Sequence, residues 1–170
     1  GSELAADGIA SLAFVNTLAA PVGAMLSWVL YEQIAHKKPT SIGAASGAVA
    51  GLVAITPSCA YLTPIFALLL GVIVGVVCAL AIELKYLWGF DDSLDVVGIH
   101  LVGGLVGTIY IGLFGTGVGL FLGFGPDQLG KQIVGALVVL VFAFVVSYIL
   151  GWLIQKTIGF RVTSTDEIAG

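Results

Sequence analysis

The stretch LTPIFALLLGVIVGVVCALAIEL, residues 62–84, is almost wholly apolar and contains one charged side chain, Glu83. An α-helix needs about 20 mostly apolar residues to cross the hydrocarbon layer of a membrane. The stretch therefore predicts a membrane-spanning helix.

The whole chain has the composition of a membrane protein. Of its 170 residues, 59% are hydrophobic and 9% are charged, whereas soluble domains have roughly 25% charged residues. So few charges cannot cover the surface of a water-soluble fold, and the predicted class is an integral membrane protein. The net charge of −4 offers no basic patch for nucleic acid, so we expect no nucleic-acid partner.

Four more apolar stretches accompany residues 62–84, and together they predict an all-α polytopic bundle of about five spans. They are Ile9–Ala35, Ser41–Pro57, Leu94–Phe114 and Lys131–Thr157. We assign residues 1–160 to the transmembrane bundle and residues 161–170 to a polar tail that is cut short.

Basic residues predict how the bundle is oriented. Lys37, Lys38, Lys85, Lys156 and Arg161 fall on one side if the spans alternate, and the other side has only Lys131. Loops rich in Lys and Arg stay in the cytoplasm. We therefore expect a multi-pass protein of the plasma membrane with its amino terminus outside and its carboxyl terminus in the cytoplasm.

Glycines recur at intervals of four within three of the spans. Small residues at this spacing let helix backbones approach closely in lipid, so helix packing is the expected role of these glycines. The repeats are Gly43, Gly47 and Gly51, then Gly71 and Gly75, then Gly103 and Gly107.

His100 lies in the stretch DSLDVVGIHLVGG, residues 92–104, among apolar neighbours. An ionisable side chain in such a setting is costly and usually has a function or a partner. One interpretation is that His100 lines a narrow passage beside Val96 and the glycines Gly103, Gly104 and Gly107, because a neutral imidazole offers one donor and one acceptor nitrogen. The other is that it bonds to a neighbouring helix for packing.

Three acidic residues, Asp91, Asp92 and Asp95, precede the fourth span. Carboxylates suit a helix N-terminus, so one of them is expected to cap the helix. The alternative is that Asp91 and Asp92 form an acidic vestibule at the inner mouth of a cation pathway. We find no nucleophile–base set, nucleotide-binding loop or metal-ligand cluster, and so expect no enzyme activity, cofactor or metal.

Three blocks of sequence together resemble the Amt branch of the Amt/MEP/Rh ammonium transporter family. Members of that family usually have eleven spans, form homotrimers and carry one pore through each subunit. The resemblance implies that this chain corresponds to the last five spans, and we expect it to be a fragment. The blocks are LAFVNT (12–17), KPTSIGAASGAVAGLVAITPSCAYLTP (38–64) and DDSLDVVGIHLVGGLVG (91–107).

The resemblance also implies roles for individual residues. His100 matches the second of two pore histidines, whose first member belongs to an earlier helix that this chain lacks. Val96 falls where the family has an apolar pore wall. Ser2 matches a serine whose hydroxyl belongs to the outer ammonium-recruitment site. A PII-type regulator at the cytoplasmic face is the implied protein partner.

The implied function is passage of ammonium or ammonia across the plasma membrane. Ammonium is recruited at the outer mouth and sheds its proton. Either a neutral species alone or a neutral species with a separately relayed proton then passes His100, because a bare cation is costly to bring into a dry pore. The alternative is a structural membrane module without a pathway, in which His100 only bonds between helices.

Overall fold

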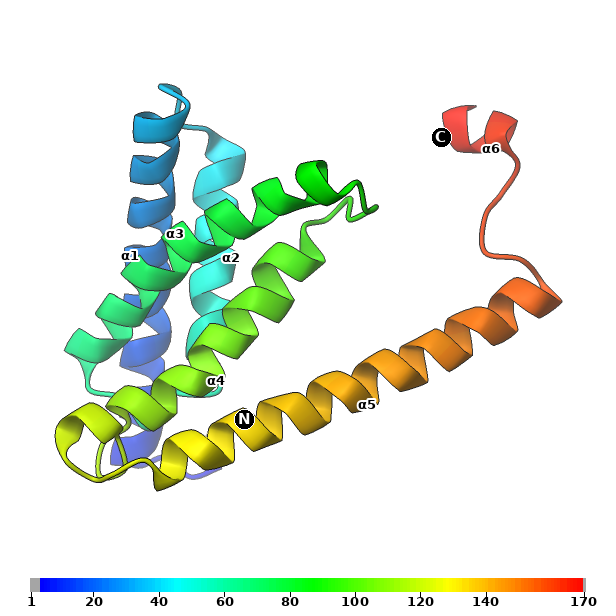
Figure 1. Ribbon diagram of the computed structural model, residues 1–170. Helices are drawn as coiled ribbons and strands as arrows, with labels where there is room; N and C mark the ends of the chain where they lie inside the picture. Colours follow the sequence, from blue (N-terminus) through cyan, green and yellow to red (C-terminus); the bar gives the residue numbers. More distant parts are fainter. Residues whose placement is uncertain (1–3, 170) are drawn as a thin grey trace. The chain divides into compact units, whose positions relative to one another are not determined.

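The computed structural model describes residues 4–169, and all regular structure within them is helical, which confirms the predicted all-α class. Figure 1 shows the helices in chain order. They are α1 (Gly8–Ala35), α2 (Ser41–Ile55), α3 (Pro64–Trp88), η1 (Val97–Leu101), α4 (Val102–Phe114), η2 (Leu120–Leu122), α5 (Asp127–Thr157) and α6 (Ser164–Ala169).

Each of the five apolar stretches forms a helix. Within the described residues, α1, α3, the continuous segment Val97–Phe114 and α5 are long and apolar enough to cross a membrane, whereas α2 is shorter. Some boundaries differ from those predicted. For example, α5 begins at Asp127 rather than Lys131, and α3 runs on to Trp88 before Gly89 ends it with a left-handed φ of 66°.

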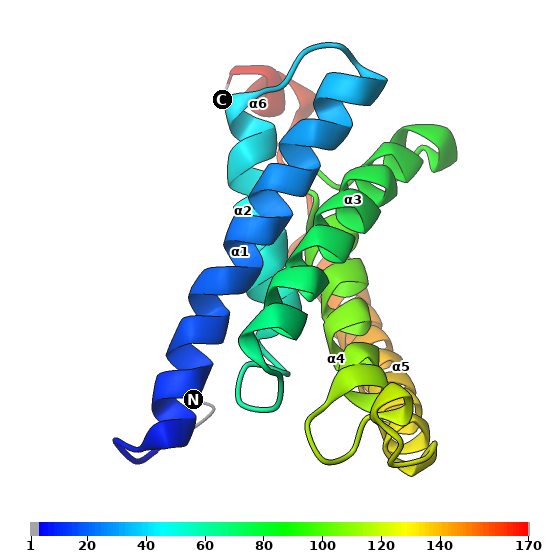
Figure 2. The ribbon, with the colours of Figure 1, turned by 90° about the vertical axis from the view of Figure 1, so that its left-hand side faces the viewer.

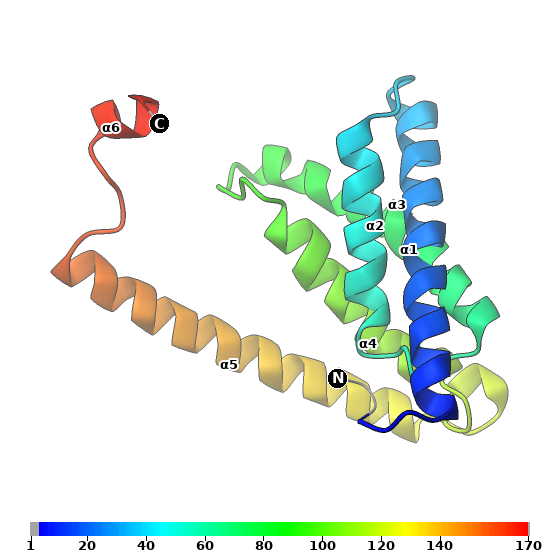
Figure 3. The same cartoon turned by 180° about the vertical axis from the view of Figure 1, so that it is seen from behind.

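The chain divides into two compact units, Gly1–Ile133 and Val134–Gly170. In the first unit, α1, α2, α3 and the η1–α4 segment run alternately up and down (Figures 1 and 3). In the second unit, the remainder of α5 leads to α6, and none of the described residues there is buried.

Hydrogen bonds identify which loops of the first unit share an end of the bundle. The His36 Nε2 atom lies 3.0 Å from Glu83 Oε1, which joins the α1–α2 loop to the end of α3. At the other end, the backbone N–H of Thr116 donates to the Tyr61 carbonyl over 2.8 Å. The α1–α2 loop and the end of α3 therefore share one end of the unit, as the predicted alternation of spans requires.

Glycines allow α2 and α3 to lie directly against α1 (Figure 2). A Cβ atom added at Gly47 would lie 2.8 Å from the Trp28 Cβ, and one at Gly51 would lie 2.5 Å from the Pro21 Cα. Both distances are too short for a real side chain, so the helices meet backbone to backbone. The predicted packing role of these glycines is confirmed.

Asn16 links α1 to the turn between α2 and α3. Its side chain is fully buried, and its amide nitrogen donates to the carbonyls of Cys59 at 2.8 Å and Leu62 at 2.7 Å. These carbonyls lie beyond the last turn of α2, where no helical partner is available. Asn16 therefore satisfies backbone groups that would otherwise be unpaired in an apolar surrounding.

We predict that Gly47→Ala destabilises the protein by about 1–3 kcal/mol, because the added methyl group overpacks the contact with α1. The measurement is the midpoint of thermal unfolding in detergent. Gly130→Ala is the matched control, since a Cβ at this exposed position of α5 meets nothing within 4 Å. Equal midpoints for the two variants would contradict the packing role.

We predict that Asn16→Ala lowers the free energy of unfolding by about 1–3 kcal/mol, because it leaves two buried carbonyl groups without a hydrogen bond. Unfolding in a titration with sodium dodecyl sulfate measures it. Thr17→Ala is the comparison, because the Thr17 hydroxyl donates to Ala13 within the same helix at 2.7 Å. If Asn16→Ala unfolds no earlier than Thr17→Ala, the bonds to the turn are not stabilising.

Candidate functional site

The candidate site begins in the loop that joins α3 to η1. After Gly89, the chain runs without regular structure to Asp95, which has a φ of 56°. Aspartate tolerates this left-handed conformation better than most residues do, but a helix cannot continue through it. The helix predicted to start at Leu94 therefore starts at Val97.

The first turn of this segment, η1, is a π-helix rather than an α-helix. The backbone N–H of Val102 donates to the carbonyl of Val97, five residues earlier. Such wide turns are rare and occur frequently at functional sites. Here the turn contains His100.

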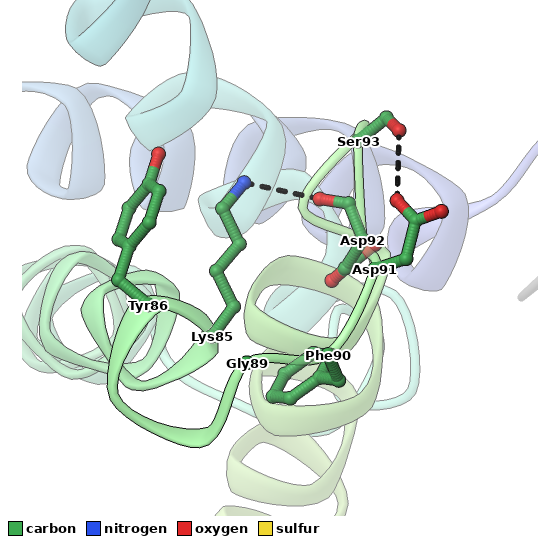
Figure 4. Close-up of a pocket in the computed structure, with 7 residues that line it drawn as sticks. All are labelled: Lys85, Tyr86, Gly89, Phe90, Asp91, Asp92 and Ser93. Carbon is green, nitrogen blue, oxygen red and sulfur yellow. Dashed lines mark hydrogen bonds between the residues drawn. The ribbon is translucent and has the colours of Figure 1, made fainter.

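Asp92 caps the wide turn. Its two carboxylate oxygens accept the backbone N–H groups of Val96 at 2.8 Å and Val97 at 2.9 Å. The cap expected from one of the three aspartates is thus confirmed for Asp92. Asp91 points elsewhere, and its carboxylate accepts the Ser93 hydroxyl at 3.3 Å (Figure 4).

Lys85, near the end of α3, binds the same loop. Its ammonium group donates to the Asp92 carbonyl at 3.0 Å and forms an ion pair with the Asp95 carboxylate. The Lys85 side chain is 13% exposed and that of Asp95 26%. In the sequence, Lys85 served only to predict the orientation of the bundle. A lysine at the end of one span, followed by aspartates at the start of the next, could have indicated this ion pair.

A pocket of about 350 Å³ opens beside this ion pair (Figure 4). It brings Asp91 and Asp92, the predicted vestibule residues, together with the lysine of α3. Its lining also includes two aromatic side chains, so polar and apolar groups both face the pocket. The lining residues are Lys85, Tyr86, Gly89, Phe90, Asp91, Asp92 and Ser93.

His100 lies on the exposed face of the wide turn. Its imidazole makes no hydrogen bond or ion pair within residues 4–169. Val96, about one turn earlier, is 48% exposed. Gly98 and Ile99, in contrast, are buried, and a Cβ at Gly98 would lie 2.7 Å from the Ile82 Cγ1 of α3.

The glycines expected beside His100 divide between two environments. Gly103 and Gly107 are buried, and Gly107 lies against Ala54 of α2, so both serve helix packing. Gly104 is partly exposed, and a Cβ there would meet nothing within 4 Å. Of the three glycines, only Gly104 has open space beside it. Ser2, the predicted outer-site residue, lies outside the described residues.

A second polar network lies at the same end of the first unit. Glu83 accepts the Tyr31 hydroxyl at 2.8 Å and contacts His36, which is therefore a paired loop residue. Glu32 accepts the backbone N–H of Thr40 at 2.7 Å. These carboxylates tie the α1–α2 loop to the adjacent helices.

Known proteins resemble the whole chain. The family model for the ammonium transporter family matches residues 1–170. An ammonium transporter of Mycobacterium tuberculosis is 48% identical over 100% of this chain and 38% of its own length. One of Bacillus subtilis is 40% identical over 100% of this chain and 44% of its own length. The chain thus spans less than half the length of these relatives, which are named as transporters, not enzymes.

Solved structures agree with the sequence relatives. A sensor Amt protein matches 96% of this chain and 41% of its own with a TM-score of 0.88 and 27% identity. Saccharomyces cerevisiae Mep2 matches 92% of this chain and 38% of its own with a TM-score of 0.86 and 28% identity. With its apolar helices, this likeness makes the chain part of a multi-pass membrane protein. The chain belongs to the ammonium transporter family.

Proposed function

We propose that the protein carries ammonium or ammonia across the plasma membrane along a pathway that passes His100. The observation that carries this proposal is the unpaired imidazole on the exposed face of η1. Within the described residues His100 bonds to no adjacent helix, which is the arrangement expected of a side chain that faces a pathway. Membership of the ammonium transporter family supports ammonium or ammonia as the solute.

The surroundings of His100 suit a small, weakly polar solute. Val96 and Leu101 are apolar and exposed on the same segment, so they offer a passing solute no hydrogen bond. A bare cation would lose its hydration in such a passage at great cost, whereas ammonia loses far less. The neutral imidazole can donate or accept one hydrogen bond and so offsets part of that loss.

The remaining parts of the mechanism extend the same proposal. Asp91 and Asp92 form a cytoplasmic vestibule, where their negative charge attracts the cation that leaves or enters the passage, while Asp92 also caps the wide turn. Ser2 supplies a hydroxyl to the outer recruitment site. The protein works as a homotrimer with its carboxyl terminus in the cytoplasm, where a PII-type regulator binds.

We predict that His100→Ala lowers methylammonium uptake about fivefold, because loss of one hydrogen bond to the solute costs about 1 kcal/mol. Uptake is measured with radiolabelled methylammonium in cells that lack their own ammonium transporters. These cells express the protein at its native length, and each rate is divided by the amount of protein in the membrane.

His36→Ala is the matched control, because it removes the chain's other imidazole from an exposed loop. We expect its uptake per molecule to stay within about twofold of the wild type, as is usual for surface substitutions. Normal uptake by His100→Ala would exclude this histidine from the pathway. No uptake by the wild-type protein would favour a structural membrane module instead.

A further inference from the structure

The wide turn at Val97–Leu101 is held in a conformation that its own backbone does not favour. A π-turn is rare within helices, and Asp95, just before it, has the left-handed φ of 56°. Aspartate adopts this conformation more readily than most residues do, but contacts from the surrounding structure still have to hold the loop in it. The contacts that enforce it therefore control the shape of the turn.

One of these contacts comes from within the loop and another from α3. The Asp92 carboxylate holds the first N–H groups of the turn. Lys85 joins both the Asp92 carbonyl and the Asp95 carboxylate to the end of α3. Because most of the Lys85–Asp95 pair is shielded from water, salt and solvent weaken it less than an exposed pair.

The same turn determines the direction of His100. Gly98 and Ile99 are fixed against α3, where Gly98 lies close to Ile82. Successive residues of a helical turn point in fixed and different directions around its axis. The position of the residues that face α3 therefore sets the side on which the next residue, His100, emerges.

We infer that Lys85 is a positioning residue for His100, which it acts on by holding the loop and the wide turn against α3. This inference rests on the proposed function, since the direction of the imidazole matters only if it faces a pathway. Lys85 contacts no solute in this scheme. Its positive charge is offset by Asp95, so it does not repel a passing cation.

The test uses Lys85→Met, which keeps an unbranched chain and removes the ion pair. A variant that only lowers the number of folded transporters reduces the maximal rate and leaves the KM and the selectivity unchanged. A misdirected imidazole changes how the solute is bound. We therefore measure the KM for methylammonium and the inhibition of its uptake by ammonium, in cells expressing the native-length protein.

We expect Lys85→Met to change the ammonium-to-methylammonium preference or the KM by about threefold or more, as for a hydrogen bond that is weakened rather than lost. Lys85→Arg keeps the positive charge and a donor for Asp95. Its KM for methylammonium and its preference should therefore stay within about twofold of the wild type. Lys38→Met removes a lysine from an exposed loop at the same end, and should leave both values unchanged.

Wild-type KM and preference in Lys85→Met would overturn the inference, and so would a fall in maximal rate alone. If Lys85→Met does not reach the membrane, the double variant Lys85→Met/Asp95→Asn decides by the same measurements, because it removes the ion pair and leaves no unpaired charge behind. Wild-type and His100→Ala uptake are measured in parallel. These two rates test the proposed function separately. Wild-type uptake by His100→Ala would overturn both the pathway past His100 and the positioning role of Lys85.

Discussion

Direct contact between helix backbones holds this bundle together. In lipid, no hydrophobic effect draws one apolar helix to another, so the helices must gain from contact itself. Glycines of α2 and α3 place those helices directly on α1, where any side chain would collide with the backbone. Asn16 adds a polar link, since its amide holds the carbonyls of the turn between α2 and α3. These contacts give a rigid support for the less regular segment that follows.

That segment, from Gly89 to Leu101, combines an irregular loop with a wide helical turn. Irregular backbone leaves donors and acceptors that need partners among protein groups or water. Here the Asp92 carboxylate and the Lys85 ammonium group do so from within the described chain. The buried face of the turn rests on α3, and its exposed face presents His100. In the proposed pathway, this restrained backbone fixes the side of the turn from which His100 emerges.

Much of the fold could be predicted from the sequence, because long apolar stretches have few alternatives in a membrane. All five predicted stretches are helices, and the glycine repeats of α2 and α3 pack as expected. The interpretation of Gly103 and Gly107 as neighbours of His100 did not hold, since both are buried. That interpretation assumed a regular helix of 3.6 residues per turn from Asp95 onwards. One extra residue in a wide turn shifts every preceding side chain around the axis, and residue spacing does not reveal it.

The class of protein, the number of apolar helices and the family follow from the order of residues alone, because hydropathy and short residue blocks do not depend on folding. The same order marks His100 as unusual, since an ionisable group among apolar neighbours is costly wherever it lies. The folded chain was needed to show which aspartate caps the turn and which carboxylate Lys85 binds. It also decided which glycines face another helix and that the imidazole is left without a partner in the described chain. These outcomes depend on the rotation of each helix and on the path of one loop. Both are set by contacts between residues far apart in the sequence.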